Sequence, residues 1–247
     1  MINRWLFATL ILLKVAVVIK AVVFDLDDTL ISETHYQASA RSAVLNHLAE
    51  LTGISLEEIV AESKVADEGP REYYFQSLLP KLGMEASPEA VTNLIDIHRE
   101  HTPSISWYPD VLETLEGLRS LGVKLGVITD GYSVAQHQKL MAVEAATHFD
   151  AIVVSDDLGR EFWKPHQKTF LKIAGELNAD PEELIYVGDN PEKDFYISKS
   201  LPITTVRIKR EDALKAGRAY RGDVVEDYAV DSLVDLVELC KRLNEES

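Results

Sequence analysis

The stretch from Val22 to Leu30 reads Val-Val-Phe-Asp-Leu-Asp-Asp-Thr-Leu and constrains the fold more than any other part of the chain. Residues 18–24 are rich in β-branched and aromatic side chains, which is typical of a strand buried on both faces of a parallel sheet. Such a strand brings Asp25 to the carboxyl edge of the sheet, where ligands of open α/β sheets bind. Asp25 and Asp27 fall on the same side of the chain if the extended geometry continues.

Two interpretations of these acids remain open at this point. Burial of two carboxylates at close range costs free energy unless a cation or hydrogen-bond donors compensate, which indicates a metal site. Alternatively, the acids form a turn that caps a helix, with Asp28 or Thr29 as the N-cap residue. The rest of the chain decides between the two.

The charge and the cysteine count narrow the class of partner. The formal charge of −16 argues against a nucleic-acid partner, because nothing neutralises a phosphate backbone broadly. A small phosphorylated substrate needs only a local positive site, which a bound divalent cation can supply. The single cysteine, Cys240, excludes an internal disulfide and indicates a reducing compartment, so we expect a cytoplasmic location. Cys240 falls in an apolar helical pattern, which predicts a buried structural thiol.

Residues 1–16 are an N-terminal extension of uncertain status. The apolar run over residues 5–13 follows Arg4 and is similar to the apolar region of a signal peptide. No small-residue cleavage site follows it, and Lys14 and Lys20 interrupt any full membrane span, so a membrane association is not expected. The alternative is an artefact of start-site choice, with the functional domain beginning near Val17.

Residues 31–104 predict an all-helical insert. Ser55 followed by Glu58 forms a capping box at the start of one helix, and Ser87-Pro88-Glu89 is a typical start of another. Helical spacing and glycine or proline breaks place the helices at 33–51, from 55 onward, at 71–82 and at 87–101. No strand pattern interrupts them.

After residue 104, strand patterns alternate with helix patterns. Strands are expected at 123–129, 151–155, 184–187 and 203–208. Helices are expected at 110–121, 133–143, 165–177, shortly after Pro191 and at 231–243. This alternation implies right-handed crossovers and a parallel sheet that is covered on both faces, which is the α/β class.

Polar residues follow four of the predicted strands: Asp25 with Asp27, Thr129, Lys164, and Asp189 with Asp194. The carboxyl ends of parallel strands meet at one crevice, so these side chains should converge there. Each motif alone has a structural interpretation, such as a turn at Thr129-Asp130-Gly131 with Asp130 as N-cap, or a solvated lysine at position 164. Their joint order and location favour a functional site.

Taken in order, these motifs resemble those of the haloacid dehalogenase-like superfamily of phosphohydrolases. The matching segments are Asp25-Leu26-Asp27-Asp28-Thr29 for the first motif, Thr129 for the second, Lys164-Pro165 for the third and Gly188-Asp189-Asn190-Pro191-Glu192-Lys193-Asp194 for the fourth. The resemblance covers about residues 18–245. It implies a Rossmann-like parallel sheet core, residues 17–30 and 105–247, with a small helical cap, residues 31–104, inserted between the first two motifs.

The resemblance also implies a mechanism that the residue types suit. Asp25 would be the nucleophile that forms an aspartyl-phosphate, and Asp27 would protonate the leaving oxygen and later activate water. A group that acts as acid and then as base must hold a proton near neutral pH, so a raised pKa is expected for Asp27. Mg²⁺ would be held by the Asp25 carboxylate, the Asp27 main-chain carbonyl and Asp189.

The remaining motif residues take supporting roles in this resemblance. The phosphoryl oxygens would be held by the Thr129 hydroxyl, the N–H groups of Asp130 and Gly131, and Lys164. Thr29 would order the loop, and Asp194 would support the metal shell or Lys164. Asp28 is expected only to flank the site.

Several alternatives remain. Asp27 argues against cleavage of carbon–halogen bonds, because dehalogenases of the superfamily lack this second acid, and the Asp-Lys-Thr-Gly-Thr of its ion pumps is absent. A sugar phosphomutase, a phosphonate-cleaving enzyme using Lys64 or Lys81, and a non-catalytic binding or regulatory protein on the same fold stay open. The favoured substrate is a small phosphorylated metabolite, either a sugar phosphate or a nucleoside monophosphate, and the oligomeric state is open between monomer and homodimer.

Substrate contacts from the cap are expected among polar and aromatic residues of its helices: His35, Tyr36, Arg41, Arg71, Tyr73 and Tyr74. Trp163, next to Lys164, either shapes the pocket or anchors the packing.

Overall fold

The computed structural model describes residues 18–67, 73–215 and 217–246. Within these residues, six parallel strands form one sheet in the order β3-β2-β1-β4-β5-β6. The strands are β1 (Ala21–Phe24), β2 (Lys124–Thr129), β3 (Ala151–Val154), β4 (Leu184–Gly188), β5 (Thr204–Ile208) and β6 (Tyr228–Val230). The predicted α/β class with a Rossmann-like parallel sheet is confirmed.

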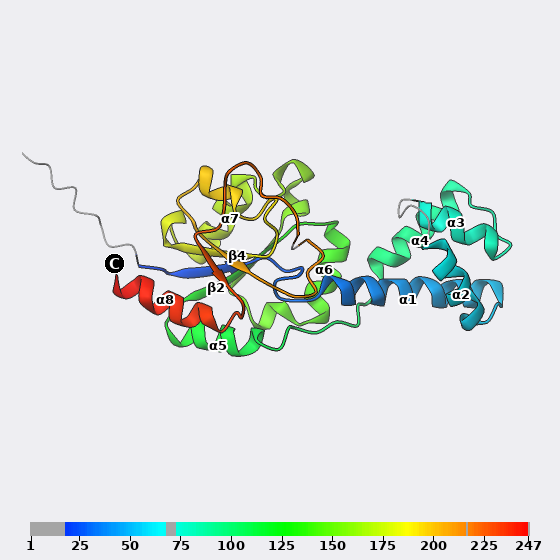
Figure 1. Ribbon diagram of the computed structural model, residues 1–247, viewed down its shortest axis with the longest axis horizontal. Coiled ribbons are helices and arrows are strands. Elements are labelled where there is room, and N and C mark those ends of the chain that lie inside the picture. Colours follow the sequence, from blue (N-terminus) through cyan, green and yellow to red (C-terminus); the bar gives the residue numbers. More distant parts are fainter. Residues whose placement is uncertain (1–17, 68–72, 216, 247) are drawn as a thin grey trace, which may run out of the picture.

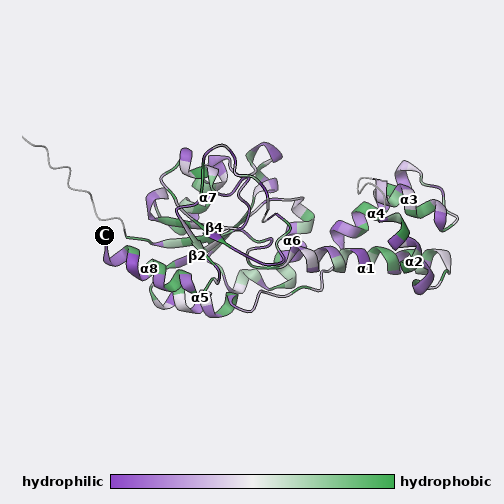
Figure 2. Ribbon diagram, in the orientation of Figure 1, coloured by the Kyte–Doolittle hydropathy of each residue, from purple (hydrophilic) through white to green (hydrophobic). Residues whose placement is uncertain are grey.

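Helices cover both faces of the sheet (Figure 1). On one face, apolar side chains come from α5 (Val111–Ser120), α6 (Ser133–Ala142) and α8 (Asp235–Glu245). On the other face, α7 (Gln167–Leu177) supplies Phe170, Ile173 and Leu177. Figure 2 shows hydrophobic residues gathered on the strands between these layers. The strands therefore have the two-sided burial that a parallel sheet requires.

The first strand is shorter than the sequence pattern predicts. All four residues of β1 are buried, but Val18 is 49% exposed and pairing with β2 begins only at Ala21. The β-branched run begins before the point where both faces of the strand are covered. The sequence pattern alone therefore placed the start of the strand too early.

Four helices form a second body, which we call the helical lobe: α1 (Glu33–Thr52), α2 (Leu56–Ala66), α3 (Tyr74–Lys81) and α4 (Pro88–Glu100). They share an apolar cluster of their own, which includes Leu48, Ile59 and Leu78 and is separate from the two clusters of the sheet. The long helix α1 starts beside the sheet and runs out into the lobe (Figure 1).

The caps of the lobe helices follow the sequence signals. Ser55 and Glu58 form the predicted capping box of α2, and Ser87 accepts a hydrogen bond from the N–H of Ala90 at the start of α4. The N-cap of α1 is Ser32, not Asp28 or Thr29. The predicted helix over 71–82 is observed from Tyr74, and Arg71 lies outside the described residues.

The C-terminal part contains a strand that the sequence analysis missed. β6 has only three residues and none of them is fully buried, so it carries no clear apolar signal. It lies just before the last helix, and α8 begins at Asp235 instead of the predicted Asp231. Cys240 is fully buried in α8, as predicted, and burial raises the pKa of its thiol to about 12.

Short 3₁₀ helices connect the larger elements: η2 (Ala145–Thr147), η3 (Ser155–Leu158), η4 (Arg160–Phe162), η5 (Pro181–Glu183) and η6 (Tyr196–Lys199). The helix expected after Pro191 is η6. Among the helices of the described residues, none is long and apolar enough to cross a membrane. Residues 1–16 lie outside the described residues, so the predictions made for them remain untested.

Candidate active site

The candidate site lies where the order of the strands reverses. The chain runs from β1 through β2 to β3 on one side, then returns to place β4, β5 and β6 on the other. Asp25 directly follows β1, and Asp189 directly follows β4, so both stand at the carboxyl ends of adjacent strands. This switch point is where open α/β sheets bind ligands.

Lys164 is the centre of a buried cluster of charges. Its Nζ lies 2.5 Å from Oδ1 of Asp25 and 3.0 Å from Oδ1 of Asp194. It also donates a hydrogen bond to the Tyr186 hydroxyl at 2.7 Å, which in turn donates to Asp194. Burial lowers the pKa of Lys164, but the charges of Asp194 and Asp25 outweigh it and raise that pKa well above its ordinary value.

Three carboxylates in this cluster fit a divalent cation. Asp25, Asp189 and Asp194 each offer an oxygen, and these oxygens lie within 4.8 Å of one another. Oδ2 of Asp189 is buried and has no hydrogen-bond partner among the described residues. Buried carboxylates without donors are costly, and hard oxygen ligands are those that Mg²⁺ prefers. The donor set therefore fits the magnesium ion that the motifs predict.

The pKa values reflect the same excess of negative charge. Burial raises the pKa of Asp189 to about 8, helped by the charges of Asp194 and Asp25. Burial also raises the pKa of Asp25 to about 6, although Lys164 acts in the opposite direction.

Asp194 differs from Asp189 because its oxygens have partners. One oxygen is bound by Lys164 and Tyr186, and the other accepts the N–H of Asn190 at 2.9 Å. The backbone of Gly188 makes this approach possible, since a Cβ there would lie 2.5 Å from Oδ2 of Asp194.

A second buried lysine, Lys139 of α6, binds the other acid of the first motif. Its Nζ lies 2.7 Å from Oδ1 of Asp27 and 2.7 Å from Oε2 of Glu33, in the first turn of α1. The ring of Tyr36 lies over the same ammonium, 4.0 Å from its centroid. Lys139 thus connects the loop that follows β1 to the first helix of the lobe.

This contact overturns the expected pKa of Asp27. Burial alone raises it, but the charge and hydrogen bond of Lys139, with a hydrogen bond from Gln136, lower the pKa of Asp27 below its ordinary value. The prediction of a raised pKa was wrong because it considered only the acids of the motif and no cation from α6.

The second motif is ordered by Gln136. The Thr129 hydroxyl donates to Oε1 of Gln136 at 2.9 Å, and Nε2 of Gln136 donates to Oδ2 of Asp27 at 3.2 Å. Gly131 has a φ of +144°, and a Cβ there would lie 2.3 Å from Nε2 of Gln136. Gly131 therefore leaves room for the side chain that links Thr129 to Asp27.

The Asp130 side chain has a structural set of partners. It accepts hydrogen bonds from the Ser155 hydroxyl, the Lys164 N–H and Nζ of Lys193. It is not the N-cap of α6, because that position belongs to Tyr132.

Asp28 and Thr29 are both buried. Asp28 has a φ of +56°, and its carboxylate accepts the N–H groups of Glu33 and Leu214. It therefore fixes the start of α1, which a merely flanking residue does not do. The Thr29 carbonyl accepts a hydrogen bond from Arg210, whereas its hydroxyl has no partner within the described part of the chain.

Sequence reasoning missed Lys139, Gln136, Tyr186 and Lys193. A signal existed for Lys139, because it follows the buried Ala135 by four positions and precedes the buried Val143 by four. A lysine on the apolar face of a helix needs a buried partner of opposite charge.

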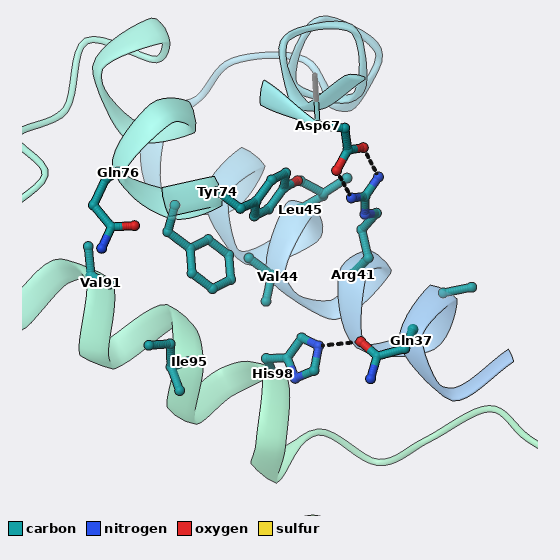
Figure 3. Close-up of a pocket in the computed structure, with 12 residues that line it drawn as sticks. Gln37, Arg41, Val44, Leu45, Asp67, Tyr74, Gln76, Val91, Ile95 and His98 are labelled. Carbon is teal, nitrogen blue, oxygen red and sulfur yellow. Dashed lines mark hydrogen bonds and ion pairs between the residues drawn. The ribbon is translucent and has the colours of Figure 1, made fainter. Parts of the chain in front are cut away.

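The lobe residues that were expected to contact substrate differ in burial and in position. Tyr36 is buried over Lys139, whereas His35 and Tyr73 are exposed. Arg41 and Tyr74 line a cavity of about 550 Å³ between α1, α3 and α4, where Arg41 forms an ion pair with Asp67 (Figure 3). Trp163 donates from Nε1 to Asp156 at 3.1 Å.

Comparison with known proteins agrees with this geometry. A family model described as "Haloacid dehalogenase-like hydrolase" matches residues 22–208, and the chain belongs to this family. A glyceraldehyde 3-phosphate phosphatase of Methanopyrus kandleri is 32% identical over 234 residues, which cover 91% of this chain and 98% of the relative. The pyrophosphatase PpaX of Bacillus mycoides is 29% identical over 227 residues, 92% of this chain and 99% of the relative.

Solved structures resemble the chain over most of its length. A HAD phosphatase from Thermococcus onnurineus has a TM-score of 0.57 and 28% identity, covering 89% of this chain and 97% of that one. A 2-haloacid dehalogenase from Pseudomonas syringae has a TM-score of 0.62 and 24% identity, covering 91% and 99%, and shares the fold. Family and phosphatase relatives together make this chain a phosphohydrolase that acts on a small phosphorylated substrate.

Proposed function

We propose that the protein is a Mg²⁺-dependent phosphomonoesterase that works through an aspartyl-phosphate at Asp25. The observation that carries this proposal is the unpartnered Oδ2 of Asp189 beside Asp25, whose other neighbour is the Lys164 ammonium. Asp25, Asp189 and the Asp27 carbonyl would hold Mg²⁺. The bound ion would offset the repulsion between an anionic nucleophile and an anionic phosphoryl group.

The chemical steps follow from the residue types. An oxygen of Asp25 attacks phosphorus, and the bond to the leaving oxygen breaks. Asp27 gives a proton to that oxygen, and it must first take up this proton when substrate binds, because Lys139 favours its ionised form in the free protein. Water then attacks phosphorus while Asp27 takes a proton from it, so that inorganic phosphate leaves and the Asp25 carboxylate is restored. Lys164, the Thr129 hydroxyl and the N–H groups of Asp130 and Gly131 hold the phosphoryl oxygens during both steps.

The helical lobe is proposed to act as the cap of this site. Its first helix starts at Glu33, and Lys139 connects that residue to Asp27. A cap over the crevice excludes water and contacts the leaving group. The named relatives suggest two compounds as first substrates to test, glyceraldehyde 3-phosphate and inorganic pyrophosphate.

The test is hydrolysis of an aryl phosphate and of these two compounds, with Mg²⁺ and with a chelator. We expect Asp25→Asn and chelation each to abolish release of phosphate, and Asp189→Asn to raise the Mg²⁺ concentration that is required. Asp235→Asn, an exposed acid in the first turn of α8, is the matched control and should behave as the wild type. Full activity of Asp25→Asn would contradict the mechanism.

A further inference from the structure

A second cavity, of about 610 Å³, adjoins the catalytic cluster and is strongly basic. It shares Lys164 with that cluster, and its lining includes four further cationic side chains: Lys193, Lys215, Arg218 and Arg221. The acids among its lining residues are Asp130 and Glu192. We call it the basic cavity. A concentration of positive charge in a chain with a net charge of −16 indicates a local site for an anion.

The segment between β5 and β6, residues 209–227, brings three of these cations to the site. It is tied to the loop that follows β1, because Leu214 donates its N–H to Asp28 at 2.8 Å and Arg210 donates to the Thr29 carbonyl at 2.9 Å. Asp212 adds a bond from the Ser32 hydroxyl at 2.7 Å. Lys215, Arg218 and Arg221 therefore lie on a segment that is hydrogen-bonded to the loop that follows β1.

Lys215 differs from the other cations of the basic cavity. Lys193 pairs with Asp130 at 3.0 Å, Arg218 pairs with Glu192, and Arg221 lies over the ring of Tyr196. Lys215 is half-buried as a residue, and within the described residues its ammonium makes no direct hydrogen bond or ion pair.

The charges that act on Lys215 are those of the reaction site. Burial lowers the pKa of Lys215, but the carboxylates of Asp25, Asp27 and Asp189 outweigh it and raise that pKa. A cation near these acids without a direct partner keeps its hydrogen-bond donors available for a ligand.

We propose that the basic cavity binds a second anionic group, a carboxylate or a phosphate, of the substrate whose phosphoryl group lies at Asp25. This inference rests on the proposed phosphatase function and names its substrate class. The enzyme then prefers phosphorylated acids and diphosphates to phosphate esters with a neutral remainder. Lys215 is the residue that determines this specificity, and Arg218 and Arg221 extend the positive surface.

The experiment uses a matched pair of substrates, 3-phosphoglycerate and glyceraldehyde 3-phosphate, which differ by a carboxylate in place of an aldehyde. We expect kcat/KM of the full-length wild type to be about tenfold or more higher for 3-phosphoglycerate, the size of one charge-assisted hydrogen bond. Inorganic pyrophosphate, compared with methyl phosphate, tests whether a second phosphate serves as well. A preference in the first pair supports the proposal. Phosphate is a better leaving group than methanol, so the second pair supports it only where Lys215→Met loses the preference for pyrophosphate.

Variants locate the effect. Lys215→Met should reduce the preference for the anionic partner about tenfold, because it removes the unpaired cation, and Lys215→Arg should restore most of it. Lys209→Met is the matched control, since this lysine lies in the same segment but is exposed and pairs only loosely with Asp231, at 3.9 Å. Urea unfolding of each variant shows that it is folded.

The possible failures are distinguishable. Equal efficiency on both members of each pair would overturn the specificity and leave the phosphatase function standing. Equal losses of Lys215→Met on both members would also overturn it, because they would assign Lys215 to the transferred phosphoryl group. No hydrolysis of these compounds or of an aryl phosphate would overturn the proposed function itself.

Discussion

Two buried lysines, Lys164 and Lys139, each bind two carboxylates, but they connect different parts of the molecule. Both partners of Lys164, Asp25 and Asp194, lie in the α/β core. Lys139 joins Asp27 of the core to Glu33, the first residue of the helical lobe. The first lysine therefore holds the core together at the proposed site of phosphoryl transfer, and the second connects the lobe to the proposed proton carrier.

The balance of charge also differs between the two clusters. Around Lys164, the three carboxylates of Asp25, Asp189 and Asp194 face one buried ammonium, and Oδ2 of Asp189 has no hydrogen-bond partner in the described part of the chain. Around Lys139, each carboxylate has a direct bond to the lysine and a further donor, Gln136 for Asp27 and Gln37 for Glu33. The first cluster needs additional positive charge, and the second is complete. The carboxylates around Lys164 can therefore bind a metal ion, whereas the ion pairs of Lys139 connect the helical lobe to the core.

The largest expected effect comes from Lys164→Met. It leaves Asp25 and Asp194 buried without their ammonium, so we expect a loss of about 3–5 kcal/mol in the free energy of unfolding and of about 10³-fold in kcat/KM. Urea unfolding and phosphate release measure the two. Lys172→Met removes an exposed pair with Glu176 on α7 and should change stability by less than about 0.5 kcal/mol. Activity of Lys164→Met within tenfold of the wild type would refute the assigned role.

Lys139→Met should affect the proton transfer more than the fold of the phosphoryl site. We expect kcat to fall about 10²-fold with an alkyl phosphate, whose leaving oxygen needs a proton from a correctly placed Asp27. With p-nitrophenyl phosphate, whose leaving group needs none, the loss should be at least about tenfold smaller. A merely structural role for Lys139 predicts equal losses on both substrates.

Glu33→Gln sharpens the same comparison, because it keeps the pair between Lys139 and Asp27 and removes only the charge on the side of the lobe. Its loss in kcat should be about tenfold smaller than that of Lys139→Met. An equal or larger loss would show that the lobe, and not Asp27, is the partner that matters.

A third pair, Asp110 with Arg210, provides a comparison in which neither residue belongs to the four motifs. Burial raises the pKa of Asp110, but the hydrogen bonds of Arg210 and the N–H of Leu233 outweigh it and lower that pKa. A lowered pKa in the folded state contributes stability above the unfolded value of about 3.9, and that contribution is lost as the pH falls through the folded value.

Asp110→Asn should therefore cost about 1–3 kcal/mol at neutral pH, with the difference from wild type shrinking below about pH 4. Urea unfolding at several pH values measures it. Asp231→Asn is the control, because the Asp231 side chain is 87% exposed. A difference for Asp110→Asn that stays constant with pH would contradict the assigned ion pair.

The sequence alone predicts the core cluster but not the second lysine. Asp25, Thr129 and Asp189 each follow a strongly apolar run, so strand pattern and sheet topology suffice to bring them to one edge. Lys139 and Lys215 come from a helix and a connecting segment whose positions depend on tertiary packing. Neither follows a strand, so strand pattern does not place them at the site, although its apolar neighbours indicate that Lys139 is buried.

The pKa of Asp27 likewise could not be predicted from the sequence. Its position could be predicted from the motif, whereas its pKa depends on Lys139, 112 residues further along the chain. Electrostatic shifts are set by neighbours in space, so the type and order of the motif residues do not determine them.

The most direct test of the account is to look for a phosphoryl group on Asp25 during turnover. The reaction with Mg²⁺ and substrate is quenched in acid within the first turnover, and the tryptic peptide of residues 21–41 is examined by mass spectrometry. The account predicts a phosphorylated peptide with the modification at Asp25, absent without substrate and absent in Asp25→Asn. Turnover with a phosphoryl group on another residue, or with none on this peptide at any time, would contradict it.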